Sequence, residues 1–165
     1  IKNLKFMTFF NYQKKNRILK NTLLNLRKKI NYNKSSKKNK LVIISRSKSR
    51  RKLINEHELY KSLKKYGFKS YCFEDLSISE QINLCNDSKL LIGYQGSGLI
   101  NSIYMQKGSV LIDITNKYID NYIYPILTSQ LGIKYYNSKC SKSYKNLDGI
   151  CNVVEIEKIV KKIIC

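Results

Sequence analysis

The stretch SKLLIGYQGSGLIN at residues 88–101 decides the fold, because it joins a short apolar run to a glycine-rich turn. The run LLI at 90–92 ends at Gly93, and the turn Gly96–Gly98 opens an amphipathic segment. A strand, a glycine turn and a helix in this order point backbone N–H groups and a helix N-terminus at one place, which favours an anion, usually a phosphate. Gly-x-Gly after an apolar run also occurs as a simple strand-to-helix turn, and for this motif alone that alternative stays open.

Strand-like and helix-like segments alternate along the chain on both sides of this stretch. LVIIS at 41–45 is a continuous apolar run, which is typical of a strand buried on both faces. The other predicted strands are 69–73, 89–93, 109–114 and 133–136, and the predicted helices are 55–66, 78–87, 98–106, 122–131 and 155–164. Gly67 is placed to end the first of these helices, and Ser77 with Glu80 resembles a capping box for the second.

This alternation, with strands at intervals of roughly 20–30 residues, favours right-handed crossovers and a parallel sheet. The predicted fold class is α/β: a Rossmann-like parallel sheet with helices on both faces. Because the strand runs lack period-two alternation, we expect Ile43, Leu91 and Leu111 to be central and buried.

Residues 1–40 differ in pattern from the rest of the chain. Apolar residues at helical spacing predict a helix over 14–30, and the polar residues 31–40 predict a linker. We therefore expect a basic helical segment and linker at 1–40, a remnant of a preceding domain, and one α/β domain at 41–165. The first residue is Ile1 rather than methionine, so we expect part of the parent protein to precede this chain.

The chain carries a formal net charge of +21, and most of the excess lies near its start. Residues 1–52 hold 18 of the 32 Lys and Arg residues and no Asp or Glu, whereas the remaining residues hold 14 basic and 11 acidic side chains. The sequence is also rich in Asn, Ile and Tyr, which suggests an AT-rich genome as the source of much of the lysine. A solvated basic face is the favoured interpretation, and contact with anionic lipid, a phosphorylated substrate or nucleic acid is the alternative.

Polar side chains of the kinds that bind phosphate follow the predicted strands. In an open parallel sheet, ligands bind at the carboxyl ends of the strands. Arg46 and Arg51 follow the first strand, and the planar guanidinium of Arg46 suits a diphosphate. The third strand leads into Gln95 and the glycine turn, and Asp113 near the end of the fourth suits a ribose diol, with a role in a cap or turn equally open. We expect Arg46, the Gly96–Gly98 backbone and Asp113 to converge on one cleft that holds a nucleoside diphosphate.

Other chemistries lack their motifs in this sequence. Neither G-x-x-x-x-G-K-[ST] nor G-x-G-x-x-G occurs, which disfavours an ATPase and a dinucleotide-dependent oxidoreductase. The single histidine, His57, lies early in a predicted helix with no nucleophile elbow, so a serine hydrolase is not supported. The five cysteines include no Cys-x-x-Cys pair, so no metal site is expected.

Three successive segments resemble one enzyme family. They are ISRSKSRRKLINEHEL at 44–59, YGF at 66–68 and EDLSISEQINLCNDSKLLIGYQGSGLINSIYMQKGSVLIDI at 74–114. Their order and spacing are similar to the carboxyl-terminal half of family 61 glycosyltransferases, over residues 41–137. The family pattern has an Ile-Ser-Arg strand end, an Arg-x-x-x-Asn-Glu segment, a Ser-x-x-Glu-Gln helix start, a Gly-x-His-Gly-Ala-Gly-Leu-x-Asn turn and an acidic strand end. The family resembles bacterial capsular-polysaccharide enzymes and includes plant xylosyl- and arabinosyltransferases and O-linked N-acetylglucosaminyltransferases.

The resemblance implies one half of a GT-B architecture, in which two Rossmann-like domains face each other. It implies an inverting transferase, without an essential metal or cofactor, that moves a sugar from a nucleotide sugar, usually a UDP-sugar, to a glycan or glycoprotein acceptor. Residues 41–165 would form the nucleotide-sugar-binding domain, and the general base would lie on the other domain. The expected compartment is cytoplasmic or membrane-associated, with the Golgi or endoplasmic reticulum lumen as the alternative if a preceding segment carries a signal anchor.

The resemblance also assigns roles residue by residue. Donor-phosphate binding falls on Arg46, Arg51, Gln95, Gly96, Ser97 and Gly98, ribose binding on Asp113, and support of the site on Asn55, Glu56, Glu80, Gln81 and Asn101. Gln95 stands where the family has His, and Ser97 stands where it has Ala. Because glutamine donates hydrogen bonds to phosphate but cannot act as a base or carry a charge near neutral pH, no catalytic residue is assigned.

Two other functions remain open. Gln95 makes a degenerate, non-catalytic nucleotide-sugar-binding module an alternative to an enzyme. A nucleic-acid-binding domain built on the basic N-terminal region is less favoured, because Tyr12 and Tyr32 are isolated and form no stacking platform. No nucleic-acid partner is therefore expected, and a peripheral membrane contact through the basic segment stays open.

Overall fold

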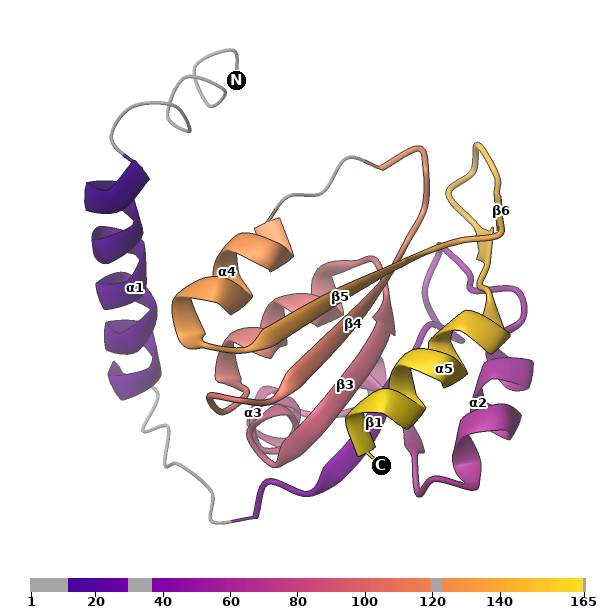
Figure 1. Ribbon diagram of the computed structural model, residues 1–165, viewed down its shortest axis with the longest axis horizontal. Helices are drawn as coiled ribbons and strands as arrows, with labels where there is room; N and C mark the ends of the chain where they lie inside the picture. The colour runs from indigo at the N-terminus through magenta and orange to yellow at the C-terminus, as the bar shows by residue number, and fades with distance from the viewer. Residues whose placement is uncertain (1–11, 30–36, 120–122, 165) are drawn as a thin grey trace. The chain divides into compact units, whose positions relative to one another are not determined.

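The computed structural model describes residues 12–29, 37–119 and 123–164 (Figure 1). The chain divides into two compact units, Ile1–Asn33 and Lys34–Cys165. The division of roles between 1–40 and 41–165 that the sequence suggests stays a prediction.

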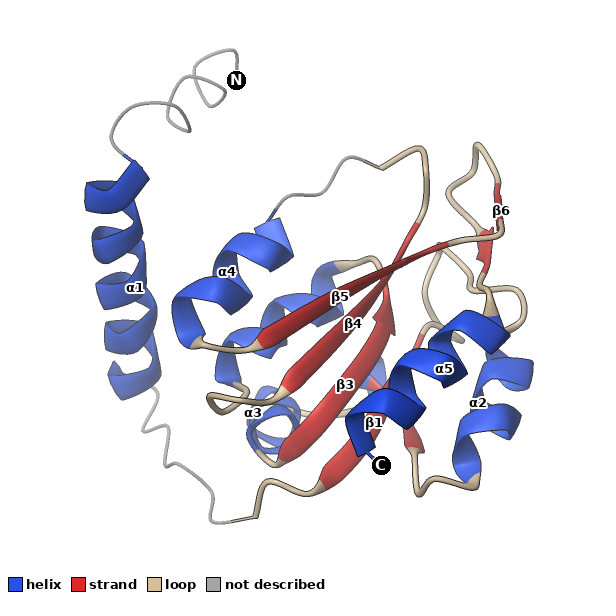
Figure 2. Cartoon of the chain, viewed as in Figure 1, coloured by secondary structure: helices blue, strands red, loops and turns tan. Residues whose placement is uncertain are grey.

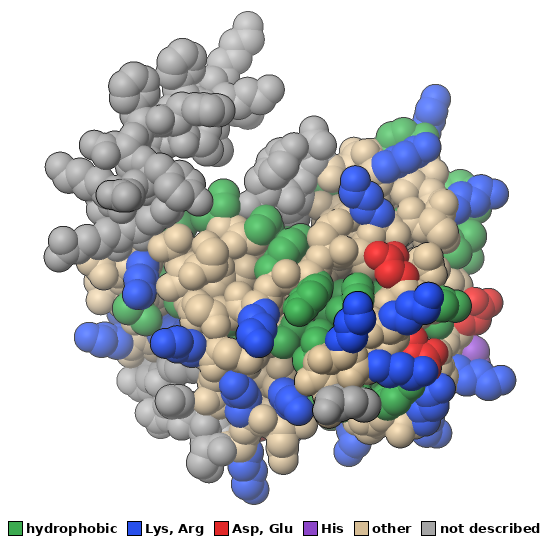
Figure 3. Space-filling view, viewed as in Figure 1, with side chains coloured by type: hydrophobic (Ala, Val, Ile, Leu, Met, Phe, Trp, Pro, Cys, Tyr) green, Lys and Arg blue, Asp and Glu red, His purple; other side chains and the backbone are tan. Residues whose placement is uncertain are grey.

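The first unit contains α1 (Tyr12–Lys29), close to the helix predicted over 14–30. Its last turn carries Arg27, Lys28 and Lys29, where positive charge interacts favourably with the carbonyl end of the helix. No helix among the described residues is long and apolar enough to cross a membrane. On the face shown in Figure 3, the described Lys and Arg side chains are dispersed among other side chains, which is typical of a solvated basic surface.

The second unit is built on a parallel sheet that has five strands among the described residues. The strands are β1 (Lys40–Ser45), β2 (Lys69–Cys72), β3 (Ser88–Tyr94), β4 (Val110–Thr115) and β5 (Lys134–Lys139). Their order in the sheet is β2-β1-β3-β4-β5, and every neighbouring pair is parallel. The predicted α/β class and parallel sheet are confirmed, and the side chains of Ile43, Leu91 and Leu111 are each no more than 1% exposed.

Helices cover both faces of this sheet (Figure 2). They are α2 (Glu56–Lys64), α3 (Ile78–Asn86), the 3-10 helix η3 (Ser97–Tyr104), α4 (Ile123–Leu131) and α5 (Val153–Ile164). Helix α2 packs against α5, whereas η3 packs against α3 and α4. Ile92 of β3 belongs to the core beneath α2 and α5, and the next residue, Gly93, lies against Leu99 of η3. Because successive residues of a strand point to opposite faces, the two groups of helices lie on opposite sides of the sheet.

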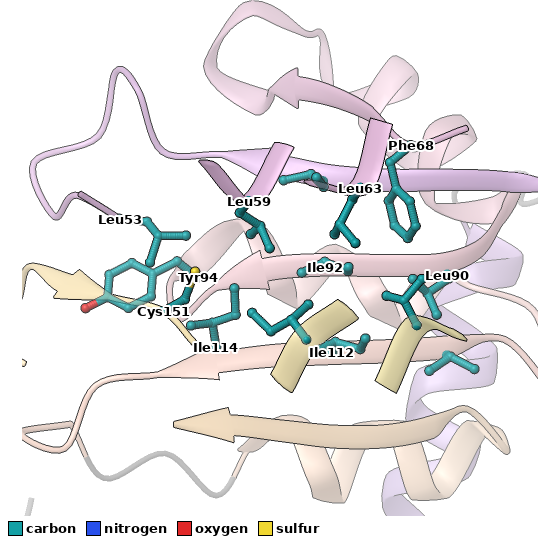
Figure 4. Close-up of a cluster of buried hydrophobic side chains, with 14 residues drawn as sticks. Leu53, Leu59, Leu63, Phe68, Leu90, Ile92, Tyr94, Ile112, Ile114 and Cys151 are labelled. Atoms are coloured by element: carbon teal, nitrogen blue, oxygen red, sulfur yellow. The ribbon is translucent and has the colours of Figure 1, made fainter. Parts of the chain in front are cut away.

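The core between the sheet and the α2–α5 pair is continuous and apolar (Figure 4). Its buried side chains include Ile43, Leu59, Leu63, Phe68, Leu90, Ile92, Ile112, Ile114, Ile156 and Val160. Full burial of one such side chain contributes about 1.5–3 kcal/mol relative to leaving it in water. This packing holds the strands in register, so the loops at their carboxyl ends start from fixed positions.

Local signals at helix ends agree with the predictions. The Ser77 N–H donates to Oε2 of Glu80 at 2.8 Å, and the Ser77 hydroxyl accepts from the Glu80 N–H, so the predicted capping box at the start of α3 is confirmed. After α2 the backbone of Gly67 has a φ of 90°, a left-handed conformation that favours glycine.

Two local predictions are corrected, and one element was not predicted. The segment predicted as a helix over 98–106 forms a 3-10 helix instead, because Gly98 and Asn101 weaken an α-helix and only a short run separates β3 from β4. The second strand ends at Cys72 and continues as the 3-10 helix η2 (Phe73–Asp75). A hairpin of β6 (Lys142–Ser143) and β7 (Gly149–Ile150) was not predicted, since strands of two residues leave no periodicity in the sequence.

Replacing Gly93 by alanine is expected to destabilise this fold. A Cβ at this position would lie 2.7 Å from Cδ2 of Leu99, a side chain that is 1% exposed. We expect the free energy of unfolding to fall by about 1–3 kcal/mol, the usual cost of overpacking a core, in urea denaturation.

The matched control is Gly98→Ala, where the added Cβ would meet Ile44 and Phe73 at ordinary distances of 3.5 and 3.6 Å. That variant is expected to unfold nearly as the wild type does. If both variants lose the same stability, the close approach of Leu99 to Gly93 is not what restricts this position.

Candidate functional site

The order of the strands creates one crevice at the carboxyl edge of the sheet. From β1 the chain crosses to β2 on one side, and from β3 it continues to β4 and β5 on the other side. Neighbouring strands whose connections leave in opposite directions open a crevice between their carboxyl ends, where α/β folds of this order bind ligands. Arg46 follows β1 and Gly96 follows β3, so both lie at this crevice.

Among the charged side chains at this crevice, Arg46 is the most deeply buried. Its side chain is 9% exposed, and its Nε has no hydrogen-bond partner among the described residues. No carboxylate of the described residues lies within ion-pair distance of it. Burial, and then the charge of Arg51, lower the pKa of Arg46 from its ordinary value, which is high enough that the group stays charged at neutral pH. A buried cation without a protein partner is suited to an anionic ligand.

The start of α2 holds the backbone from which Arg46 projects. The Glu56 carboxylate accepts hydrogen bonds from the Ser45 hydroxyl and, at 2.7 Å, from the Arg46 N–H. The Asn55 side chain in turn accepts from the Cys151 N–H at 2.9 Å and donates to the Cys151 carbonyl at 3.1 Å. The structure thus brings Asn55 and Glu56 to the arginine loop, as supports rather than as ligand contacts.

The glycine turn lies against the guanidinium of Arg46. A Cβ on Gly96 would stand 2.6 Å from Nη1 of Arg46, so only glycine lets the guanidinium rest against the turn. The Tyr124 hydroxyl donates to the Gly96 carbonyl at 2.6 Å and fixes the turn from α4. Ser97 and Gly98 begin η3, where a 3-10 helix supplies no acceptor for the first N–H groups. Arg46 and the start of η3 therefore line the same space.

A pocket of about 300 Å³ lies beside this contact. It is lined by Ile44, Ser45, Arg46, Phe73, Glu74, Gln81, Ser97, Gly98 and Asn101. Gln81 ties its walls together, because its Nε2 donates to the carbonyls of Phe73 and Leu76 and its Oε1 accepts from Asn101 Nδ2 at 2.8 Å. Glu80, by contrast, stays exposed in the capping box of α3 and lines no part of this pocket.

A second hollow of about 520 Å³ shares Arg46, Glu74 and Ser97 with this pocket. It is lined by Arg46, Ser49, Arg50, Arg51, Glu74, Ser97 and Leu147. Arg51 thus joins Arg46, as the sequence leads one to expect. Glu74 is the acidic member, and a hydrogen bond from the Ser49 hydroxyl keeps the pKa of its carboxyl below the usual range.

Asp113 does not share this cleft with Arg46 and the glycine turn. The strand β4 runs on to Thr115, so Asp113 lies inside it, paired with Gly93, and its side chain is fully buried. The Tyr135 hydroxyl donates to Oδ2 at 3.0 Å, and burial raises the pKa of Asp113 to about 6. The expected convergence on one cleft therefore holds for Arg46 and the turn, and the described pockets do not include Asp113.

Gln95 lies beneath the glycine turn rather than on the pocket wall. Its side chain is 1% exposed, and its Oε1 accepts from the Asn116 N–H at 3.3 Å. Its Nε2 has no hydrogen-bond partner among the described residues. The NH2 group of this amide therefore has no partner among the described residues and lies close to the turn.

Asn116 and Leu147 are two site residues that no sequence pattern predicted. Asn116 Nδ2 donates to the Tyr94 hydroxyl at 2.9 Å and to the Asp148 carbonyl at 2.8 Å. These bonds place the β6–β7 hairpin beside the crevice. The Asp-Gly pair at 148–149 is a turn signal that would have located the hairpin, although not its contact with the site. No group of three or more His, Cys, Asp or Glu side chains that could hold a metal ion occurs in the described part of the chain.

Comparison with known proteins agrees with the resemblance in sequence. The family model described as Glycosyltransferase 61 matches residues 1–112. Over 82 residues the chain is 29% identical to the EGF domain-specific O-linked N-acetylglucosamine transferase of Gallus gallus. That match covers 47% of this chain and 15% of the relative, so the chain spans only a small part of the relative's length.

Replacing Gly96 by alanine is expected to weaken anion binding without unfolding the protein. The added Cβ pushes the guanidinium of Arg46 away from the pocket. Because this is the flexible end of a long side chain, the displacement costs the fold little. We expect the affinity for pyrophosphate to fall by about tenfold, equivalent to roughly 1.4 kcal/mol, in calorimetric titration.

Gly108→Ala is the control, since Gly108 stands at the sheet edge opposite the carboxyl ends, before β4. Its φ of 79° predicts some loss of stability and no loss of affinity. If Gly96→Ala binds pyrophosphate with unchanged affinity, the contact between Arg46 and the turn does not contribute to anion binding.

Proposed function

Because the chain belongs to glycosyltransferase family 61, we propose that it supplies the donor-binding part of an enzyme that transfers a sugar from a nucleotide sugar. The proposed donor is a UDP-sugar, and the proposed acceptor is a glycan or a protein. The observation that carries this proposal is the buried guanidinium of Arg46, which has no acidic partner among the described residues and rests against the glycine turn at the crevice.

The proposed chemistry uses charge rather than a reactive side chain. When the bond between the sugar and the diphosphate breaks, negative charge develops on the departing phosphate oxygens. We propose that Arg46 and the N–H groups at the start of η3, which line the same pocket, stabilise this charge with little reorganisation. A cation and N–H groups of this kind support transfer without a metal ion. We propose inversion at the sugar carbon, with the acceptor attacking from the side opposite the diphosphate.

We propose that this chain forms one half of a GT-B enzyme. The pocket lies at the edge of the sheet, where a second domain can close over it, and the chain covers a small share of its relative's length. In this arrangement the other domain brings the acceptor and the general base. The role proposed for residues of this chain is therefore limited to binding the donor and stabilising the leaving diphosphate.

A non-catalytic donor-binding module is the second candidate, and the placement of Gln95 favours it. Where the family has His, this side chain is buried and its oxygen is engaged by the Asn116 N–H. A glutamine amide does not act as a general acid or base near neutral pH, so Gln95 itself moves no proton to or from a substrate. Binding of a nucleotide sugar without turnover in the complete protein would favour this candidate.

Arg46→Ala is expected to weaken binding of a UDP-sugar by about 1.5–3 kcal/mol, the range for a hydrogen bond to a charged group. Arg46→Lys should recover part of this loss, because lysine restores the charge but not the planar pair of donors. The measurement is calorimetry on the complete protein. Lys64→Ala, an exposed position on α2, serves as the control. Unchanged affinity in Arg46→Ala rules out the role given to this residue.

Gln95→His tests whether the family histidine serves as a hydrogen-bond donor or as a proton carrier. The free Nε2 of Gln95 favours the first case. The variant should then change the transfer rate by less than about tenfold, or roughly 1.4 kcal/mol in the barrier. If a proton or a positive charge is required there, the rate should rise by about 100- to 10,000-fold.

The measurement compares initial rates of transfer in the complete protein for the wild type and the variant. Gln95→Leu is the matched control, because it removes the amide donor at similar size and should lower the rate in the first case. A rise beyond about a hundredfold in Gln95→His contradicts the preference for a simple donor.

A further inference from the structure

Two hollows meet at Arg46 and Ser97. Both residues, together with Glu74, line the pocket of about 300 Å³ and the hollow of about 520 Å³. A diphosphate held at Arg46 and Ser97 would send one end of the donor into each space. The side chains that line each space therefore indicate which one suits the sugar and which one suits the nucleoside.

Leu147 projects from an unusual backbone conformation at the larger hollow. Its φ is 70°, a left-handed value that is a strained exception for a residue with a branched side chain. The conformation is held by two hydrogen bonds. The Tyr94 hydroxyl donates to the Leu147 carbonyl at 2.7 Å, and the Leu147 N–H donates to the Tyr144 carbonyl at 2.9 Å.

A buried amide fixes the hydroxyl that holds Leu147. Asn116 is 1% exposed and donates from Nδ2 to both the Tyr94 hydroxyl and the Asp148 carbonyl. Strain that is fixed by buried polar groups persists because the surrounding structure determines it, and such strain is concentrated at functional sites.

The same hairpin is bonded to the arginine loop that forms the opposite wall. The Lys52 N–H donates to Oδ1 of Asp148 at 2.6 Å, and the Gly149 N–H donates to the Lys52 carbonyl at 3.0 Å. The Ile54 N–H donates to the Gly149 carbonyl at 2.8 Å. Arg51 precedes Lys52 and Leu147 precedes Asp148, so these bonds hold Arg51 and Leu147 at a fixed separation in the lining of the hollow.

The linings of the two spaces favour different parts of a nucleotide sugar. Guanidinium groups stack on flat rings, and an aliphatic side chain covers the apolar face of such a ring. Arg50, Arg51 and Leu147 supply these groups in the larger hollow. The smaller pocket is lined by Asn101, whose side-chain oxygen is not used in its bond to Gln81 and suits a sugar hydroxyl.

We propose that the larger hollow takes the nucleobase of the donor, with Leu147 as a residue that contacts the base and Asn116 as the residue that positions Leu147. This inference rests on the proposed function, because it requires a nucleoside diphosphate at Arg46. It deepens that function by assigning the base to the hairpin side of Arg46 and the sugar to the α3 side.

The test compares UDP with inorganic pyrophosphate, which lacks the nucleoside, in calorimetric titrations of the complete protein. Leu147→Gly removes the side chain and relaxes the backbone, since glycine adopts a positive φ freely. We expect UDP affinity to fall by about tenfold, the effect of losing one well-buried aliphatic contact. Pyrophosphate affinity should be unchanged, and stability to urea should be equal or higher.

Further variants separate a contact with the base from a change in the shape of the hairpin. Leu147→Asn tolerates the left-handed conformation and removes the apolar surface, so it should match Leu147→Gly in both titrations. Asn116→Ala should also weaken UDP selectively, with reduced stability. Lys145→Ala, at an exposed position of the same hairpin, should bind both ligands as the wild type does.

Each outcome decides between the two proposals. Unchanged UDP affinity in Leu147→Gly, or an equal loss for UDP and pyrophosphate, overturns the assignment of the base while the phosphate site stands. Wild-type protein that binds UDP no more tightly than pyrophosphate overturns it as well. Wild-type protein that binds neither ligand overturns the proposed function itself.

Discussion

The parallel pairing of β1 with β3 is the constraint on which the rest of this structure depends. The pair Ile44 and Gly93 brings two carboxyl ends together, and the loops that leave them carry Arg46 and the glycine turn. Because these strands are distant in sequence, their side chains meet only when the sheet is formed. The absence of a side chain at Gly93 lets Leu99 approach the sheet, so the 3-10 helix starts beside the crevice. The position of the site therefore depends both on the pairing of β1 with β3 and on the packing of η3 against the sheet.

Charge is organised around this crevice in an asymmetric way. The Glu56 carboxylate, which stands close enough to influence Arg46, is engaged by the Ser45 hydroxyl and the Arg46 backbone. The guanidinium therefore receives support for its position without neutralisation of its charge. A carboxylate paired with this guanidinium would have to be displaced before an anionic ligand could bind. The protein instead keeps a cation available at the cost of leaving it partly desolvated.

Much of the fold could be predicted from the sequence, because it is encoded in local patterns. The apolar runs at 41–45 and 90–92 specify buried strands, and Ser77 with Glu80 specifies a helix start within a few residues. The position of Arg46 at the site follows from strand order alone. Asp113 shows the limit of this reasoning. The strand that contains Asp113 continues to Thr115, because its pairing with β5 extends that far. No local pattern in either strand predicts where this pairing ends. The network of Asn116 and Leu147 is set by contacts between distant residues, which no local pattern reports.

The bonds between the arginine loop and the β6–β7 hairpin also have a consequence for how the protein is made. Lys52 and Asp148 are 96 positions apart, as are Asn55 and Cys151. During synthesis the arginine loop and the carboxyl ends of β1 and β3 leave the ribosome long before the residues of the hairpin that brace the loop. Contacts at such separation form late, since closing a long loop costs entropy that only the finished contact returns. The site is therefore completed among the last events of folding, and a chain cut short after β5 would retain much of its sheet while losing the brace that orders its cationic loop.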